Sequence, residues 1–398
     1  MVTNKEQNKL NVPHLRFPEF HGEWEKCKLG DIAILTKGSG ISKDQRSATG
    51  TPCILYGELY TTYKSEVIDY VVSKTDISDK NLVRSCANDI IIPSSGETAI
   101  DISTARCVLS PDVLLGGDLN IIRLKDGDGR FFSYQLNGVR KYDIAKIAQG
   151  VSVVHLYGES IKGLTVSFPS NKEQQKISTL LSLIDERIAT QSKLIEKLES
   201  LIKGISNKLF NSKEGMPVRL GAVLKERSEK TKVNNQYTVL SSTVNGLFSQ
   251  REYFSKDIAS ENNVGYKIIR LHEVVLSPQN LWMGNINYND KFDIGIVSPS
   301  YKIFFISNNF DKRYVAAMLK THRALYGYKL ISEQGASVVR RNLNLEAFEQ
   351  LIFKIPTIDK QQEIGKTISL LNSRLETERT LKATYQSQKQ YLLRQMFI

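Results

Sequence analysis

A long internal duplication constrains this sequence more than any other feature. Gln149-Gly150-Val151-Ser152-Val153-Val154 recurs as Gln334-Gly335-Ala336-Ser337-Val338-Val339, and Leu29-Gly30 recurs as Leu220-Gly221. From Pro169 to Phe210 the chain aligns without a gap on Pro356 to Phe397, at a constant offset of 187 residues. Identical residues in that stretch are Pro169, Gln174, Gln175, Ile177, Ser182, Leu183, Arg187, Thr190, Leu194, Ser200 and Phe210. A period this long predicts a duplicated domain and not a solenoid of short repeats.

Each copy of the repeat ends in a stretch with a heptad pattern. Apolar residues recur at alternating spacings of four and three, which is the 3.5-residue period of helices that pair. The predicted seam of the first copy is Ile177, Leu181, Ile184, Ile188, Gln191, Ile195 and Leu198, and that of the second is Ile364, Ile368, Leu371, Leu375 and Glu378. Glu378 duplicates Gln191, and Lys382 and Lys389 also fall on the second seam. About 42 helical residues at about 1.5 Å each predict a rod of about 60 Å.

The repeat predicts an α+β protein with two mixed α/β globular units separated by two long helices. The predicted boundaries are 1–168 for the first unit with its N-terminal tail, 169–212 for the first helix, 213–355 for the second unit and 356–398 for the second helix. Because the two helices belong to one chain, we expect them to form an antiparallel coiled coil with a pseudo-two-fold internal repeat. The alternative is that each helix packs only on its own globular unit, which leaves much of such a long seam without a partner.

Short apolar runs bounded by turn residues predict strands in both globular units. In the first unit these are 53–56, 90–93, 113–115 and 119–124, followed by a helix over 131–148. In the second they are 237–240, 266–271, 274–277 and 294–306, followed by a helix over 311–326. The order of the strands does not follow from these patterns.

Composition bounds the class of protein. The chain has 398 residues and a net charge of +12, and residues 213–398 carry 27 Lys and Arg against 17 Asp and Glu. Such a balance favours a polyanionic partner. No apolar run reaches the length of a membrane span, and residues 1–11 do not resemble a secretory leader. The four cysteines are scattered, which is typical of reduced thiols. We therefore expect a basic, soluble, cytoplasmic protein without a membrane partner.

Searches for catalytic motifs find none in this sequence. There is no phosphate-binding P-loop, and Gly38-Ser39-Gly40 is interpreted as a turn. Ser298-Pro299-Ser300-Tyr301 lacks the amide or acid that amino-methyltransferases place before two prolines. The five histidines are isolated, so we predict no metal site. An enzyme that acts alone is disfavoured, and no catalytic residue is predicted.

The duplicated segment Pro-x4-Gln-Gln-x-Ile before each long helix resembles the specificity (S) subunit of Type I restriction–modification systems. The segment Trp24-Glu25-Lys26-Cys27-Lys28-Leu29-Gly30-Asp31 is similar to the start of that family's target-recognition domains. In the second unit, 265–270, 281–284 and 295–301 also resemble segments that recur in the family. The resemblance covers nearly the whole chain.

The resemblance implies a DNA-binding subunit without chemistry of its own. In that family each recognition domain reads one half of a bipartite, asymmetric target in double-stranded DNA, and the paired helices set the spacer between the halves. Two adenine-methyltransferase (modification) subunits dock on the helices, and restriction (translocase–nuclease) subunits join them. S-adenosylmethionine, ATP and Mg²⁺ are then expected in the partner subunits, and no cofactor is expected in this chain.

Polar loops supply the candidate DNA-contacting residues. Amides and arginines read base edges, whereas lysines and hydroxyls contact phosphates. The candidates in the first unit are Thr36, Lys37, Ser39, Ser42, Lys43, Ser94, Ser95, Glu97, Thr98, Ser152, His155 and Tyr157. Those in the second unit are Gln279, Asn280, Trp282, Asn285, Ser337, Arg340, Arg341, Asn342 and Asn344. Arg341 has the fork geometry that suits guanine, whereas Arg187 and Arg374 are expected to make partner or intrahelical contacts.

Two alternatives stay open at this point. One is a coiled-coil scaffold that binds proteins without reading DNA, which the positive charge of the second half disfavours. The other is a stand-alone DNA-modifying enzyme with an unrecognised site.

Overall fold

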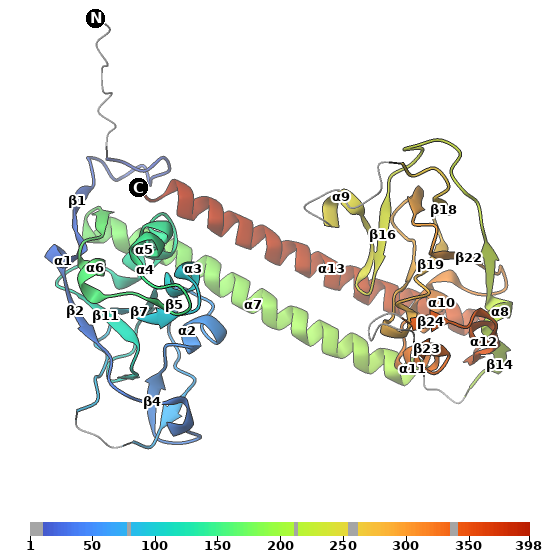
Figure 1. Ribbon diagram of the computed structural model, residues 1–398, viewed down its shortest axis with the longest axis horizontal. Coiled ribbons are helices and arrows are strands. Elements are labelled where there is room, and N and C mark those ends of the chain that lie inside the picture. Colours follow the sequence, from blue (N-terminus) through green and yellow to red (C-terminus); the bar gives the residue numbers. More distant parts are fainter. Residues whose placement is uncertain (1–10, 78–80, 211–213, 254–261, 335–340) are drawn as a thin grey trace, which may run out of the picture. The chain divides into compact units, whose positions relative to one another are not determined.

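The computed structural model describes residues 11–398 except 78–80, 211–213, 254–261 and 335–340. Two compact units divide the chain, one formed by Met1–Ser192 with Thr380–Ile398 and the other by Lys193–Arg379. Each unit combines β-sheets with part of each of the two long helices, α7 (Asn171–Phe210) and α13 (Ile358–Gln395) (Figure 1).

The first unit is built around a five-stranded sheet with the order β2-β11-β7-β9-β5, in which only the β5–β9 pair is parallel. A four-stranded sheet, β10-β4-β6-β3, and two strand pairs, β1–β13 and β8–β12, complete it. The strands are β1 (Glu25–Lys28), β2 (Ala33–Lys37), β3 (Arg46–Ser47), β4 (Thr51–Ile54), β5 (Val67–Ile68), β6 (Lys74–Thr75), β7 (Asp89–Pro93), β8 (Ser95–Gly96), β9 (Arg106–Val108), β10 (Leu114–Leu115), β11 (Leu119–Leu124), β12 (Val154–His155) and β13 (Thr165–Phe168). Its short helices are α1 (Leu29–Ile32), η1 (Lys43–Gln45), α2 (Glu58–Thr61), α3 (Ala99–Ile102), α4 (Gly129–Asn137), α5 (Lys141–Ile147) and α6 (Gly158–Lys162).

The second unit repeats the central part of this plan with an antiparallel sheet of order β15-β22-β19-β20. Four strand pairs flank it: β14–β25, β16–β17, β18–β21 and β23–β24. The strands are β14 (Met216–Arg219), β15 (Leu224–Arg227), β16 (Leu240–Thr243), β17 (Gly246–Ser249), β18 (Lys267–Arg270), β19 (Glu273–Leu276), β20 (Ile286–Tyr288), β21 (Ile294–Val297), β22 (Lys302–Ile306), β23 (Ser332–Gln334), β24 (Arg341–Leu343) and β25 (Ile352–Ile355). Its short helices are α8 (Leu220–Val223), α9 (Gln250–Tyr253), η2 (Leu281–Met283), α10 (Lys312–Met318), α11 (His322–Leu330) and α12 (Leu345–Gln350).

The α+β architecture predicted from the sequence is confirmed, but two predicted helices are wrong in detail. The helix expected over 131–148 is two helices, α4 and α5, because the backbone of Gly138 leaves the helical region after α4. The helix expected over 311–326 is likewise α10 and α11, because Thr321 caps the start of a second helix by accepting a hydrogen bond from the Ala324 N–H. The strand expected over 237–240 begins only at Leu240.

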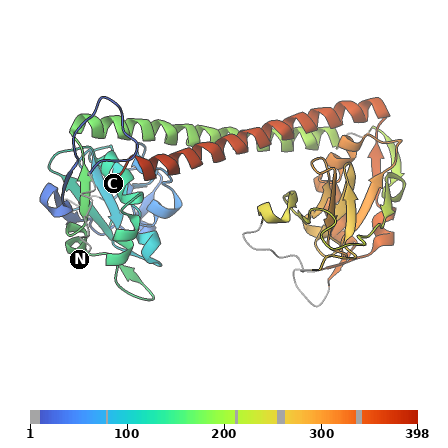
Figure 2. The same ribbon diagram turned by 90° about the horizontal axis from the view of Figure 1, so that it is seen from above.

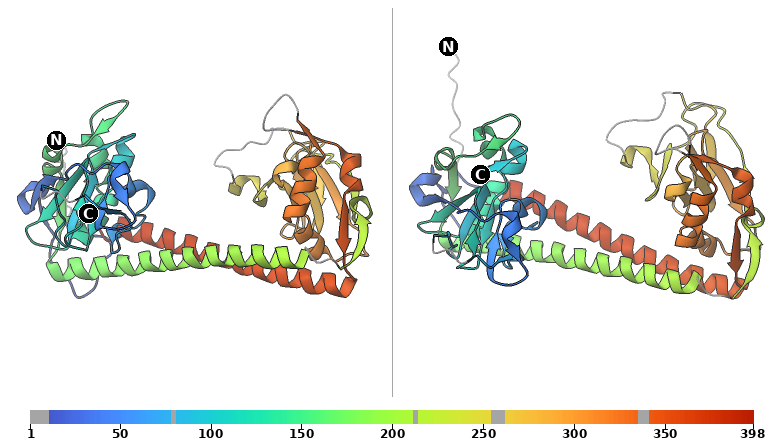
Figure 3. Two further views of the ribbon diagram at one scale, coloured as in Figure 1. Left: turned by 90° about the horizontal axis from the view of Figure 1, so that it is seen from below. Right: turned by 60° about the horizontal axis from the view of Figure 1, so that its bottom comes forward.

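The long helices run antiparallel in both units. In the first unit, the seam residues Ile177, Leu181 and Ile184 of α7 share a core with Leu392 and Met396 of α13. In the second, Ile205 and Leu209 of α7 share a core with Ile364 and Ile368 of α13. Figures 2 and 3 show α7 and α13 side by side in each unit. The predicted antiparallel pairing is therefore confirmed, and each helix half is also part of a globular core.

Burial along the helices follows the predicted seam. Ile177, Leu181, Ile184, Gln191, Ile364, Ile368, Leu375 and Glu378 are buried, whereas Ile188, Ile195, Leu198 and Leu371 are half-buried. The polar seam residue Lys389 is also buried, and it forms ion pairs with Glu66 and Asp185 in the first unit. The Tyr134 hydroxyl donates a hydrogen bond of 2.8 Å to Asp185 Oδ2. These contacts hold α13 to α7 and to the core of the first unit at one position.

The repeated glutamine before each long helix has the same structural task in both units. The Gln174 side chain donates to the Pro169 carbonyl oxygen at 2.8 Å and accepts from the Asp128 N–H at 3.0 Å. Gln361 makes the equivalent bonds to Pro356 at 2.9 Å and to Asp311 at 3.0 Å. Because Asp128 and Asp311 cap α4 and α10, each glutamine ties the start of a long helix to the start of a short one.

The repeated Leu-Gly also has a structural explanation. Leu29 and Leu220 are fully buried. A Cβ atom on Gly30 would lie 2.9 Å from Lys162 Cβ, and one on Gly221 would lie 3.0 Å from Glu349 Cβ. Only glycine therefore lets α1 pack closely on α6, and α8 on α12.

Candidate nucleic-acid interface

The duplicated Gln-Gly segment begins a β-hairpin in both units. In the first, Gln149 and His155 exchange backbone hydrogen bonds of 2.9 and 2.7 Å. In the second, Gln334 pairs with Arg341 across β23 and β24. His155 and Arg341 thus each lie opposite the repeated glutamine, although the duplicated segment itself aligns His155 with Arg340.

In the second unit the hairpin brings two of the predicted DNA-contacting residues together. The guanidinium carbon of Arg341 lies 4.6 Å from the centre of the Trp282 ring. The Arg341 N–H donates to the Gln279 carbonyl oxygen at 3.1 Å, which joins the hairpin to the loop before η2. Arg341 Nε is buried and finds no hydrogen-bond partner among the described residues. Stacking on Trp282 thus holds a guanidinium in a fixed orientation.

In the first unit the hairpin brings together two predicted loops that are far apart in the sequence. β12 pairs with β8, so that His155 lies opposite Ser95. His155 and Tyr157 stack with their ring centres 6.3 Å apart, and both side chains are exposed. Glu97 and Ser152 are also exposed. The result is a polar and aromatic surface, formed by β8, β12 and the hairpin.

Sequence reasoning missed the apolar tip of this hairpin. Val151 is 96% exposed and Val153 is 53% exposed. Both lie within the duplicated segment, so the repeat was the signal that marked them. An exposed apolar side chain at such a tip can contact the methyl group of thymine.

Several predicted candidates have hydrogen bonds within the protein. The Ser39 hydroxyl accepts from the Val83 N–H at 2.8 Å, and Thr98 caps α3 by accepting from the Asp101 N–H at 3.1 Å. Asn285 is buried, and its amide bonds to the hydroxyl and carbonyl oxygens of Ser242 at 2.7 and 2.9 Å. Asn285 therefore presents no amide to a base edge, which corrects our interpretation of this residue.

The remaining candidates divide by exposure. Thr36, Lys37, Ser42, Lys43, Gln279, Asn342 and Asn344 are exposed, whereas Ser94 is buried and Ser95 and Asn280 are half-buried. Ser42 and Asn344 cap η1 and α12. Thr36 and Lys37 end β2, and Lys43 begins η1. Ser337 and Arg340 lie outside the described residues. The exposed lysines fit phosphate contacts better than base contacts.

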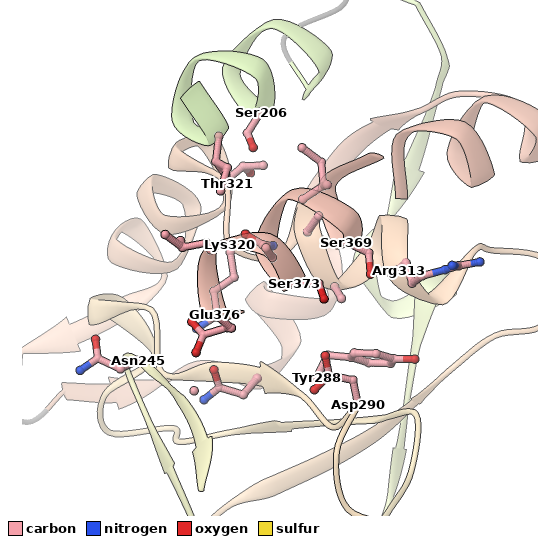
Figure 4. Close-up of a pocket in the computed structure, with 18 of the residues that line it drawn as sticks. Ser206, Asn245, Tyr288, Asp290, Arg313, Lys320, Thr321, Ser369, Ser373 and Glu376 are labelled. Atoms are coloured by element: carbon pink, nitrogen blue, oxygen red, sulfur yellow. The ribbon is translucent and has the colours of Figure 1, made fainter. Parts of the chain in front are cut away.

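A cavity of about 920 Å³ lies in the second unit, between the two long helices and the core of that unit (Figure 4). Ser369 and Glu376 of α13, Lys320 after α10, and Tyr288 and Asp290 at the end of β20 line it. Lys320 Nζ donates to the Gly284 carbonyl oxygen at 2.9 Å. Burial of this ammonium lowers the pKa of Lys320 to about 8, although part of the residue is exposed.

In the first unit, a buried ion pair takes the positions that correspond to two residues of this cavity. At the offset of 187, Asn372 and Ile202 of the cavity correspond to Asp185 and Lys389, which form a buried ion pair in the first unit. None of the predicted DNA-contacting residues lines the cavity. The cavity therefore belongs to the junction with the helices and not to the candidate interface.

Comparisons with known proteins relate this chain to one protein family. The family model for the Type I restriction modification DNA specificity domain matches residues 21–200. The chain is 26% identical over 213 residues to the Type I restriction enzyme MjaVIII specificity subunit of Methanocaldococcus jannaschii, which covers 52% of this chain and 45% of that protein. The chain is therefore similar to Type I restriction–modification specificity subunits, and residues 21–200 match their DNA specificity domain. The resemblance identified from the duplicated motifs is thus confirmed.

Two further comparisons show how much of the chain this similarity covers. A second protein of the same organism, the putative Type I restriction enzyme MjaX specificity subunit, is 27% identical over 219 residues, or 52% of this chain and 49% of that protein. The chain thus spans about half the length of the curated relatives that it matches. The crystal structure of the Type-I restriction-modification system S subunit from M. genitalium has the same fold, with a TM-score of 0.66 at 17% identity over 97% of this chain and 99% of that one.

The described residues add two findings on sites and membranes. No group of three or more His, Cys, Asp or Glu side chains in the described part of the chain is arranged to hold a metal ion. Nor does any helix in that part combine the length and apolar character needed to span a membrane.

Proposed function

We propose that this chain is the DNA-reading subunit of a Type I restriction–modification complex, in which each recognition unit reads one half of a bipartite, asymmetric target. The observation that carries the proposal is the duplicated hairpin, which presents different side chains opposite the repeated glutamine in the two units. Arg341 stacks on Trp282 in one unit, and His155 stacks on Tyr157 in the other. Because the two positions differ chemically, the two half-sites should differ in sequence.

Charge supports double-stranded DNA as the partner. Residues 213–398 carry an excess of 10 positive charges, from 27 Lys and Arg against 17 Asp and Glu. Lysines such as Lys37 and Lys43, at exposed strand and helix ends, suit phosphate contacts. Binding through phosphates should weaken steeply as salt rises, because counterions are released from the DNA.

The chemistry belongs to partner subunits in this proposal. Two adenine-methyltransferase subunits would bring S-adenosylmethionine and dock on α7 and α13, and restriction subunits would bring ATP and Mg²⁺ for translocation and cleavage. This chain would bind none of these cofactors, would catalyse no step and would act in the cytoplasm. Its contribution is to place two different readers on one duplex.

Exchange of one recognition unit tests the proposal. Replacing residues 213–355 with the corresponding segment of another specificity subunit should change one half of the methylated motif and leave the other half intact. Single-molecule sequencing of DNA methylated by the complex measures both halves. A change in both halves, or the absence of any bipartite motif, would contradict the proposal.

A further inference from the structure

Two neighbouring helices of the second unit, α10 and α11, carry cations without acidic side chains. Between Asp311 and Glu333 the sequence has no Asp or Glu. The cations of this stretch are all exposed, and they are Lys312, Arg313, Lys320, Arg323 and Lys329. In the described part of the chain, none of them forms an ion pair with an acidic side chain. Positive charge that is not compensated within the protein favours an anionic partner.

The corresponding stretch of the first unit, which forms α4 and α5, compensates most of its cations. Arg130 forms an ion pair of 2.7 Å with Asp128, and Arg140 lies 3.3 Å from Asp143. Lys146 also approaches Asp143, at 3.8 Å. The unpaired cations are therefore a property of the second unit and not of the plan that the two units share.

Two of these cations flank an exposed tyrosine on α11. Arg323, Tyr326 and Lys329 follow one another at spacings of three residues, which place them on one broad side of the helix. Tyr326 is 65% exposed, whereas Tyr328 is fully buried. One N–H of Arg323 donates to the Ile352 carbonyl oxygen at 3.4 Å, and a guanidinium has five N–H donors in all. Arginine, lysine and tyrosine side chains all donate to phosphate oxygens of DNA.

The packing of α11 joins it to both segments of the Arg341 site, which are η2 and the β23–β24 hairpin. A Cβ atom on Gly284, directly after η2, would lie 2.8 Å from the Leu325 side chain of α11. On the other side, β23 begins at Ser332, two residues after α11 ends, and the Ser332 hydroxyl donates to the Tyr328 carbonyl oxygen at 2.7 Å. The helix that carries the unpaired cations is thus fixed to the candidate base reader.

We propose that α11 holds phosphates of the duplex beside the base pairs that Arg341 reads, an inference that rests on the proposed function. Arg323 and Lys329 neutralise phosphate charges, and the Tyr326 hydroxyl donates to a phosphate oxygen. Such contacts fix the position of a protein on the duplex but carry no information on base sequence. The second unit therefore has a phosphate-binding helix that the first unit lacks.

The salt dependence of DNA binding by the full complex tests the proposal. Each cation that contacts a phosphate adds about one to the slope of log K against log salt concentration, which fluorescence anisotropy measures from about 50 to 200 mM salt. Arg323→Gln with Lys329→Gln should lower this slope by about two, and should weaken binding to target and non-target duplexes by the same factor. Arg323→Lys with Lys329→Arg keeps both charges and should keep the wild-type slope. Tyr326→Phe removes a donor but no charge, so it should weaken binding about three- to tenfold at an unchanged slope.

The double variant Lys141→Gln with Lys146→Gln is a matched control on α5, the corresponding helix of the first unit. It removes the same charge and should leave the slope unchanged, and circular dichroism should show unaltered folding of all variants. A wild-type slope in the neutral α11 variant, or an equal fall in the control, would overturn the proposal. Loss of protein subunits from the complex in place of DNA would also overturn it, because α11 would then bind protein.

The same titration separates this inference from the proposed function. If the wild-type complex binds a duplex with a slope that the neutral α11 variant does not change, only the role of α11 fails. If the wild-type complex binds no duplex at all, the proposed function fails and the role of α11 fails with it.

Discussion

Arg341 and His155 each lie opposite the repeated glutamine of a duplicated hairpin, and their neighbours decide how each side chain is held. Trp282 comes from a separate loop to support Arg341, whereas Tyr157 lies only two residues beyond His155. A guanidinium that is already oriented loses less side-chain entropy on binding. The hairpin thus presents a rigid fork in one unit and an imidazole in the other.

Arg341 should contribute to both affinity and specificity. We expect Arg341→Ala to weaken binding of the complex to its target duplex by about 1–3 kcal/mol, because a bidentate contact with a base is lost. Arg341→Lys should keep most of the affinity but relax the preference at one base pair, since an ammonium has no fork. Fluorescence anisotropy with duplexes altered at single positions measures both effects. Lys225→Ala, an exposed change on β15, should alter neither, and equal losses in the two variants would count against base reading by Arg341.

The four cysteines differ in exposure, and their reactivity therefore tests the burial of single residues. Cys53 and Cys107 are fully buried, and desolvation raises the pKa of the Cys53 thiol to about 11. Cys86 is exposed and Cys27 is half-buried. A thiol reagent at pH 8 should therefore label Cys86 rapidly and Cys27 slowly, and should reach Cys53 and Cys107 only in denaturant. Mass spectrometry of the labelled peptides would show this order, and rapid labelling of all four would contradict the described burial.

At the scale of elements, α13 is held to the first unit by a charge placed where the heptad pattern calls for an apolar residue. Lys389 bonds Glu66 and Asp185, and Tyr134 adds a hydrogen bond to Asp185. Burial and the nearby carboxylates raise the pKa of Tyr134, so its hydroxyl stays protonated and donates. Such a network is expected to fix the register of α13, because a shift by one turn would leave buried charges unpaired.

Removing the cation should destabilise the first unit strongly. Lys389→Met removes the ammonium that forms ion pairs with both buried carboxylates, and we expect a loss of about 3–5 kcal/mol in the free energy of unfolding. The triple variant that adds Glu66→Gln and Asp185→Asn should recover part of this loss, since no charge then remains unpaired. Denaturant melts followed by circular dichroism measure the differences. A triple variant less stable than Lys389→Met would show that the charges themselves do not carry the effect.

At the scale of the whole molecule, each compact unit contains part of both long helices, α7 and α13. The first unit includes Thr380–Ile398, and its core contains Leu392, Leu393, Met396 and Phe397 from that segment. Phe397 lies with its ring centre 5.1 Å from that of Phe131. A chain cut at the predicted boundary of 212 therefore lacks part of its own core.

Truncation should expose this dependence. We expect residues 1–212 alone to aggregate or to bind a hydrophobic dye, because the missing helix leaves apolar core residues exposed. Co-expression with residues 356–398 should restore a soluble, cooperatively folding species. Size-exclusion chromatography and thermal melts measure both outcomes, and a stable, monomeric 1–212 fragment would contradict the role of the C-terminal residues in the core.

The sequence alone determined the duplication, the long helices, their seam and the resemblance to Type I specificity subunits, because each depends on short-range spacing that a repeated segment shows twice. The Pro-x4-Gln motif and Leu-Gly were visible as repeats, and the structure supplied their contacts with Asp128, Asp311, Lys162 and Glu349. Helix breaks at Gly138 and before Thr321 escaped prediction, since the flanking patterns stay apolar across them.

Only the tertiary structure decided which polar side chains have partners within the fold. The sequence around Asn285 does not show that its amide is buried against Ser242. Similarly, the sequence around Thr98 does not show that this residue caps a helix. Likewise, Arg341 meets Trp282, and Lys389 meets Glu66, through contacts between segments far apart in the chain. Polar residues in loops look alike in a sequence, and burial by distant segments determines which of them remain available to bind DNA.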